Sequence, residues 1–195
     1  MAGLTPAYYT DVSQAVVYRT GELDISNACV KWNAGYRLPT EAEWEKAARG
    51  GLSGQRFPWG NAISWSQANY LGDPWFLNPN GYAYDLATAM GYDPAYSDGD
   101  NGDYPYTSPV GSFPANGYGL YDMAGNVWQW CWDWYGTYGS ESDPRGPSSG
   151  SSRILRGGVW SRDASFCRPA DRSNGNPAIN HFNGLGFRSV LSPGQ

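Results

Sequence analysis

Residues 40–49 carry the clearest pattern of apolar and polar positions along the chain. Trp44 and Ala48 are four residues apart, which places them on one face of a helix, and charged side chains fill most of the other positions. Thr40 followed three residues later by Glu43 is the signature of a capping box, and two glycines follow the last charged residue. The pattern predicts a helix over residues 40–49.

A second pattern, with a period of two, runs through residues 127–135. Tryptophan occupies every other position, and an extended chain places alternate side chains on the same face. The sequence therefore predicts a strand that carries Trp128, Trp130, Trp132 and Trp134 on one face.

Shorter runs indicate the remaining strands. Residues 154–156 and 186–191 each predict a short strand, and the uneven alternation over residues 12–24 indicates a short hairpin or ribbon. Residues 52–117 show almost no periodicity, and turn residues dominate there. We expect long irregular segments between a few short elements.

The composition agrees with a chain of this kind. Among 195 residues there are 26 Gly and 14 Pro, which are unfavourable inside helices, and 10 Trp and 15 Tyr, whose rings supply burial that disordered chains lack. The length suits one hydrophobic core, and no repeat or linker divides it. We expect a single α+β domain over residues 1–195, rich in loops and poor in regular secondary structure.

Charge and hydropathy exclude several functions. A net charge of -5 argues against binding to nucleic acid or to anionic membranes, because both need surplus Lys and Arg. No apolar run approaches the roughly 20 residues that span a bilayer, and the first residues show no secretory signal. Three cysteines allow at most one internal disulfide, and a Cys131–Cys167 pair is one open possibility.

Five motifs, spread in order along the chain, resemble those of the formylglycine-generating enzyme (sulfatase-modifying factor) family. They lie at residues 35–45 (GYRLPTEAEWE), 57–60 (FPWG), 116–128 (NGYGLYDMAGNVW), 156–158 (RGG) and 186–188 (GFR). The motifs are long and cover most of the chain, so chance similarity is a poor explanation. The resemblance implies a C-type lectin fold of the α+β class.

The resemblance also implies an activity, and this chain departs from the residues that carry it. The family's enzyme oxidises a substrate cysteine with oxygen and with copper held by two cysteines, and soft thiolates suit Cu(I). Cys167 matches the second cysteine, but Arg162 stands in place of the first, and Val159 replaces the serine after the Gly-Gly pair. Cys131 could supply the missing sulfur only from outside the motif. We therefore expect no copper and no enzymatic activity of this kind.

Other catalytic chemistry has little material in the sequence. His181 is the one histidine, which leaves His-cluster metal sites and most catalytic triads without their residues. The acidic residues are scattered, and no pair of them stands out as acid and base. No residue is nominated as catalytic.

Residues 159–185 resemble the variable region of proteins that are diversified by retroelements, several of which use this fold. In those systems, adenines of Asn codons are randomised, which cannot produce Lys, Glu, Gln, Met or Trp. These residue types are absent from the segment apart from Trp160, which matches the constant framework. The position of the segment near the C-terminus, between the last two family motifs, fits the same interpretation.

This resemblance predicts a ligand-binding surface on loops that a rigid framework supports. The residues expected to contact ligand are Val159, Ser161, Arg162, Asp163, Ser165, Phe166, Pro169, Asp171, Ser173, Gly175, Ala178, Ile179, His181, Phe182, Gly184 and Leu185. The alternative is that the segment is an ordinary wall of the fold, with Phe166 and Phe182 in the core.

Calcium is a further expectation from the family resemblance. The family binds this ion through Asn side chains and backbone carbonyls, which are suitable hard oxygen ligands. Asn126 matches one such site and Asn69 is a candidate for another, whereas Gln129 stands where the family often has Glu. Any calcium bound there would be structural.

The sequence thus favours a monomeric receptor-like protein that binds a protein or cell-surface ligand through diversified C-terminal residues. Such a protein would be displayed on a cell surface or a virion. The alternatives are a family oxidoreductase with an altered active site, or a structural domain of a larger assembly.

Overall fold

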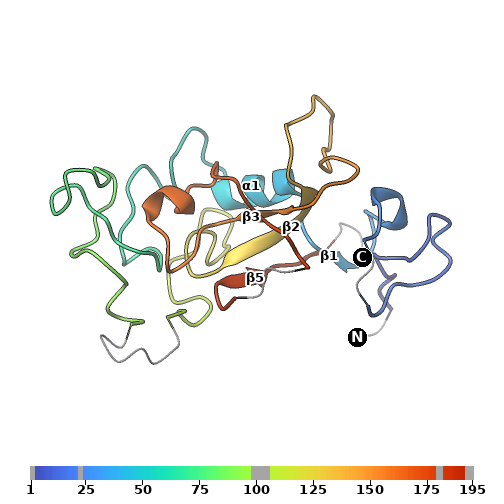
Figure 1. Ribbon diagram of the computed structural model, residues 1–195, viewed down its shortest axis with the longest axis horizontal. Helices are drawn as coiled ribbons and strands as arrows, with labels where there is room; N and C mark the ends of the chain where they lie inside the picture. The colour runs from blue at the N-terminus through green and yellow to red at the C-terminus, as the bar shows by residue number, and fades with distance from the viewer. Residues whose placement is uncertain (1–2, 22–23, 98–105, 179–181, 192–195) are drawn as a thin grey trace.

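The computed structural model describes residues 3–21, 24–97, 106–178 and 182–191. The elements in chain order are the 3-10 helix η1 (Asn27–Cys29), β1 (Tyr36–Arg37), α1 (Glu41–Arg49), β2 (Trp128–Trp134), β3 (Arg153–Arg156), the 3-10 helix η3 (Ala164–Cys167), β4 (Ser173–Gly175), β5 (Leu185–Phe187) and β6 (Val190–Leu191). Loops form most of the chain (Figure 1). The α+β, loop-rich class predicted from the sequence is confirmed. Among the described helices, none combines the length and apolar character of a bilayer span.

The predicted helix is present as α1, and its capping box is complete. The Glu43 amide donates to Thr40 Oγ1 over 3.2 Å, and the Thr40 amide donates to Glu43 Oε2 over 2.8 Å. Gly50 ends the helix in the left-handed conformation, and a Cβ there would meet the backbone of residue 117 at 2.8 Å. Trp44 and Ala48 are buried, so the apolar face predicted for this helix points into the core.

Strand β2 is central in a four-stranded sheet of order β4-β3-β2-β5. It runs antiparallel to β3 and parallel to β5, and Figure 1 shows α1 lying across the sheet. The tryptophan strand predicted from the sequence is confirmed. Its other face is also buried, because Gln129, Cys131 and Asp133 are each less than 5% exposed. Protein therefore covers β2 on both faces, and its alternating sequence does not mean that one face contacts water.

Two strand predictions are wrong in their details. The hairpin or ribbon expected over residues 12–24 is displaced toward the N-terminus: Val17 bridges Tyr9 in the antiparallel sense, and backbone hydrogen bonds of 2.9 Å join residues 8 and 10 to residues 18 and 16. The single strand expected over residues 186–191 is divided between two sheets: β5 pairs with β2, whereas β6 pairs with β1. Arg188 stands at the division, and its side chain donates to Gln129 Oε1 over 2.6 Å. This contact lies where the chain leaves β2.

The segment from residue 52 to 117 has no helix or strand element among its described residues, as its lack of periodicity predicted. Side chains hold it together instead. Asp85 is fully buried, accepts from the Tyr70 hydroxyl over 2.5 Å, and also accepts from the amides of Asp73 and Ala87. Burial, followed by the hydrogen bond to Asp85, raises the pKa of the Tyr70 phenol far above its usual value, which keeps it neutral.

A buried ionic network joins α1 to the sheet. Arg156 at the end of β3 is fully buried, donates to Glu45 of α1, and lies 3.6 Å from the Glu41 carboxylate. Glu41 also accepts two hydrogen bonds from Arg172, over 2.7 and 2.8 Å. Removing one member of such a network leaves a buried charge uncompensated, which typically costs about 3–5 kcal/mol.

Asp133 of β2 lies at the N-terminus of α1, where its carboxylate accepts from the Glu41 amide over 2.7 Å. Burial, with a smaller contribution from the nearby Glu41 carboxylate, raises the pKa of Asp133 to about 6. The folded protein therefore holds a proton on Asp133 more tightly than the unfolded chain does. This contribution to stability is present at acidic pH and is lost as the pH rises through 6.

For this reason we expect the substitution Asp133→Asn to gain stability relative to the wild type as the pH rises. The free energy of unfolding of the variant, minus that of the wild type, should increase by about 2 kcal/mol between pH 4.5 and 7.5. Urea denaturation at several pH values measures this difference. A difference that stays constant with pH would show that Asp133 is ionised throughout.

Candidate ligand-binding surface

The segment predicted to bind ligand begins where β3 ends at Gly157 and Gly158, which have φ values of 96° and 81°. A Cβ on Gly158 would lie 2.9 Å from Cys167 Sγ. Only glycine fits this left-handed, crowded turn, which folds the segment back against the core. The Gly157 carbonyl accepts from the Gly125 amide over 2.7 Å, and this contact ties the turn to the motif before β2.

Three side chains within the segment pack into the core and hold the segment in place. Trp160, Ala164 and Cys167 are each less than 9% exposed. The Trp160 ring stacks on Tyr106 at a centroid distance of 4.6 Å and an interplanar angle of 10°. Asp163 caps η3, since its carboxylate accepts from the Ser165 amide over 2.8 Å. These contacts fix the backbone without using most of the intervening side chains.

The predicted contact residues fall into three groups by exposure. The structure exposes Arg162, Ala178 and Phe182, and it half-buries Ser161, Asp163, Ser165, Phe166, Asp171, Ser173 and Leu185. It buries Val159, Pro169, Gly175 and Gly184. Ile179 and His181 lie outside the described residues.

The four buried positions cannot present a side chain to a ligand in this structure. A Cβ on Gly184 would lie 2.4 Å from the Phe182 ring and 2.6 Å from Val159, and a Cβ on Gly175 would lie 2.8 Å from Trp130. Residue type alone does not distinguish a side chain that packs against the core from one that faces a ligand, so these positions were among those expected to bind. We therefore leave Val159, Pro169, Gly175 and Gly184 out of the candidate surface.

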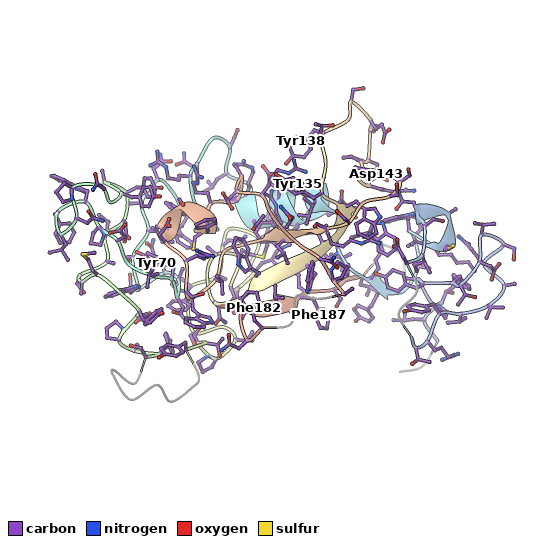
Figure 2. All side chains as sticks on the ribbon, viewed as in Figure 1. Tyr70, Tyr135, Tyr138, Asp143, Phe182 and Phe187 are labelled. Atoms are coloured by element: carbon purple, nitrogen blue, oxygen red, sulfur yellow. The ribbon has the colours of Figure 1, made fainter. Side chains whose placement is uncertain are left out.

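The two phenylalanines differ in their surroundings. Phe166 packs edge-on against Trp128 at a centroid distance of 5.9 Å, so it belongs partly to the core, as the alternative interpretation expected. Phe182 is 45% exposed, and Figure 2 shows it below the sheet. Arg162 lies 5.8 Å from the Phe166 ring. The open part of the surface thus contains one cation and one half-exposed aromatic side chain.

The arginines that follow η3 have partners within the protein. Arg172 binds Glu41 and lies over the Tyr138 ring at 4.0 Å, and Arg168 donates to the Ser165 carbonyl over 2.6 Å. Tyr138 follows β2, as Figure 2 shows. Within the part of the chain that the structure describes, Arg162 forms no ion pair. Its charge is therefore available to a partner.

The position expected for copper does not offer two sulfurs. Cys167 is fully buried, and burial raises the pKa of its thiol well above the usual range, which keeps it protonated. Cys131 packs in a different core cluster, with Trp44 and Ile154, so it cannot replace the sulfur missing at Arg162. All three cysteines are free, and the disulfide considered from the sequence is not formed. No cluster of metal ligands occurs among the described residues.

The side chains of the two asparagines predicted to bind calcium form hydrogen bonds with the backbone of other segments. Asn126 Oδ1 accepts from the Ser108 amide over 3.0 Å, and its Nδ2 donates to the Ser108 carbonyl over 3.1 Å. Asn69 Nδ2 donates to the Tyr106 carbonyl over 2.8 Å. The Asn126 oxygen is directed at an N–H group, so these contacts do not fit a cation ligand. Calcium binding stays a prediction from the resemblance.

Comparison with known proteins explains the five sequence motifs at residues 35–45, 57–60, 116–128, 156–158 and 186–188. The model of the sulfatase-modifying factor enzyme 1-like domain matches residues 7–193. The chain belongs to this family. Formylglycine-generating enzymes from Thermomonospora curvata and Mus musculus are 37% and 40% identical to it over 96% and 82% of the chain. The chain covers 56% and 42% of those two proteins, about half of their length.

Three further proteins are similar to this member of the sulfatase-modifying factor family. A mouse protein named inactive C-alpha-formylglycine-generating enzyme 2 is 36% identical over 89% of this chain, which covers 51% of that protein. Treponema denticola variable protein 1 has a similar structure, with a TM-score of 0.65 and 30% identity, over 97% of this chain and 63% of its own. CarF is similar at a TM-score of 0.63 and 25% identity, over 97% and 59% of the two chains. Both resemblances stated from the sequence are confirmed, and the fold is of the C-type lectin-like kind.

Sequence reasoning missed part of the framework of this family member. It did not predict β4, whose three residues include Ser173 and Gly175, because Ser-Asn-Gly has no strand propensity. It also missed the stacking of Trp160 on Tyr106, which brings together segments 54 residues apart. No local signal encodes either feature.

The state of Cys167 leads to a test with copper. We expect the wild type and Cys167→Ala to compete equally poorly for Cu(I) against a chromogenic chelator, because one thiol is missing and the other is buried and protonated. Tight binding that is lost in Cys167→Ala would contradict this and would favour the oxidoreductase alternative.

The contacts of Asn126 lead to a test of calcium. We expect Asn126→Ala to lower the free energy of unfolding by about 2–4 kcal/mol, because two buried backbone groups of Ser108 lose their partners. Urea denaturation should give the same loss with calcium and with a chelator. A loss seen only with calcium would instead show that Asn126 ligates the ion.

Proposed function

We propose that this chain is a ligand-binding domain whose open C-terminal side chains form a selectable contact surface. In this proposal a diversity-generating retroelement varies these side chains, and the partner is a protein or cell-surface ligand. One observation carries the proposal. Along residues 160–167 the framework side chains are buried, while Ser161, Arg162 and Ser165 between them remain at least partly open.

The chemistry of the open side chains supports recognition. Arg162 offers a cation without an ion pair among the described residues, Phe182 offers a half-exposed ring, and Ser161 and Ser165 offer small polar groups. Aromatic side chains and arginine contribute most to protein interfaces, and small polar residues adapt to different partners. A surface of this composition can exchange one ligand for another by substitution.

The framework beneath supports the same function because it does not depend on the open side chains. Stacked rings, the glycine turn and the buried arginine network hold the segment in place. Recognition loops on a rigid base lose little conformational entropy on binding. The similarity to Treponema denticola variable protein 1 adds a second line of support.

Family membership alone does not assign the oxidation reaction, because one fold carries several functions. Arg162 stands where the resemblance expects a copper ligand, and the Cys167 thiol is buried. These two facts favour binding over catalysis in this chain.

Two libraries test the proposal. The first randomises the open positions Ser161, Arg162, Ser165, Ala178 and Phe182, and the second randomises the buried positions Val159, Trp160, Ala164, Cys167 and Gly184. Both are displayed on yeast and selected against lysozyme and streptavidin. We expect most members of the first library to fold and some to bind one target specifically, because their substitutions leave the core intact. Members of the second library should lose display and melt more than about 10 °C lower.

The first library tests folding and binding separately. Loss of folding in the first library would show that the open side chains are structural, and folded members without any specific binder would remove the recognition role. The genome offers an independent check, since the proposal requires a reverse transcriptase nearby and a near-copy of the last codons with AAC or AAT at the varied positions.

A further inference from the structure

A groove, which we call the α1 groove, runs along the face of α1 that carries Glu41, Glu45 and Arg49. It has a volume of about 880 Å³. These three residues are spaced four apart, so they lie in a line along the floor, which the helical rise makes roughly 12 Å long. The walls come from the loop after α1, the loops on both sides of β2 and the segment after η3. All the lining residues belong to the described part of the chain.

The charged side chains at the floor form a row in which the sign alternates. Arg172 donates to Glu41 over 2.7 Å, and Arg49 donates to Glu45 over 2.7 Å. The buried Arg156 stands between the two carboxylates and contacts both. The row therefore begins and ends with an arginine, and three cations share two carboxylates. One positive charge is left without a balancing carboxylate.

Lys46 adds a second positive charge to the α1 groove. Its side chain is exposed, and it forms no ion pair within the ranges that the structure describes. The two carboxylates that line the groove are already held by arginines, so turning to Lys46 would break partly buried contacts. Glu141 and Asp143, in the loop after β2, are not among the lining residues. The groove is therefore cationic, although the whole chain has a net charge of -5.

Two exposed tyrosines stand at opposite ends of the floor. Tyr138 is 64% exposed, and its hydroxyl donates to Glu41, in the first turn of α1, over 3.3 Å. Tyr118 is 54% exposed and lies beside Gly51, just after the helix, where an added Cβ would be 3.4 Å from the Tyr118 ring. Tyrosine rings bury large areas with few rotatable bonds, which makes them good contacts for a peptide. A ligand that lies along the floor would thus meet a ring at each end.

We propose that the α1 groove binds a short acidic peptide segment in an extended conformation. Four extended residues span roughly 13 Å, which matches the floor. Carboxylates on such a segment would neutralise Lys46 and the arginine at each end of the row, and the two tyrosine rings would pack against its ends.

Charge also favours a short ligand over a long polyanion. The Debye length is about 10 Å at 0.1 M salt, so a segment that stays within the groove is attracted mainly by the cations that line it. A nucleic acid would extend past the groove over a protein whose net charge is negative, and it would be repelled there. The same argument distinguishes the groove from a general anion-binding surface.

The α1 groove is separate from the candidate ligand-binding surface. Ala170 and Arg172 line the groove from within residues 159–185, but neither was among the expected contact residues. Figure 2 shows Tyr138 above the sheet and Phe182 below it. The inference therefore does not rest on the proposed function, and either one can fail without the other.

Two charge reversals at matched positions test the site. Lys46→Glu reverses the charge inside the groove, and Arg19→Glu makes the same change outside it. Both side chains are exposed and neither forms an ion pair among the described residues, so both variants should fold. A third variant, Tyr118→Ser, removes one ring and leaves the charge unchanged. Circular dichroism and the melting temperature report the folding of each protein.

Isothermal titration calorimetry with acetyl-tetraglutamate amide gives the result, and the tetraglutamine peptide is the neutral control. We expect saturable 1:1 binding of the glutamate peptide to the wild type at low salt, weaker binding as NaCl is added, and no binding of the glutamine peptide. Lys46→Glu should weaken binding about tenfold, because attraction becomes repulsion, and Tyr118→Ser should weaken it about threefold. Arg19→Glu should stay within about twofold of the wild type, since a distant exposed charge is screened.

Several results would overturn the proposal. They are a wild type that does not bind the glutamate peptide at about 1 mM, equal binding of the glutamine peptide, or equal losses in Lys46→Glu and Arg19→Glu. Oligothymidylate that binds the wild type more tightly than the peptide, and loses affinity in Lys46→Glu, would assign the groove to nucleic acid and overturn it as well.

Discussion

The fold depends on one fully buried guanidinium. Arg156 ends β3 directly before the glycine turn, and it donates to Glu45 of α1 and to the carbonyl of Asp171 in the C-terminal segment. Glu41, beside it, is held by Arg172 from the same segment. The helix, the central sheet and the segment after η3 therefore meet at one ionic centre. Such a centre adds little net stability over an apolar core, but it tolerates few alternative arrangements, and this property suits a framework that must keep one shape.

That framework explains how one family can support both chemistry and recognition. The residues that build the scaffold, among them Trp44, Asn126 and Arg188, contact the core or the backbone and are independent of any reaction. The positions that a copper enzyme needs lie in the segment after the glycine turn, where this chain has Arg162 and a closed Cys167. In the proposed function, recognition depends on a few side chains of the C-terminal segment, while the rest of the sequence preserves the fold.

Sequence patterns predicted the elements whose signal is local. The capping box of Thr40 and Glu43 marked α1, and the tryptophan alternation marked β2. The division of the last strand was not predictable, because it depends on Arg188 reaching Gln129 across 59 residues. In the candidate surface, residue type led to a list of expected contact positions but did not predict which of them are accessible. Gly184 and Val159 were expected to contact ligand, yet they are buried by contacts with Phe182 and the core.

The crowding around Gly184 limits how such a segment can evolve. A randomising mechanism that alters codons blindly produces larger side chains at this position in most copies, and each would collide with the Phe182 ring or with Val159. Those copies would misfold before any ligand could select them. The functional repertoire is then set by the few codons whose side chains face solvent. A template with a non-mutable glycine codon at positions such as 184 would give a larger share of folded products.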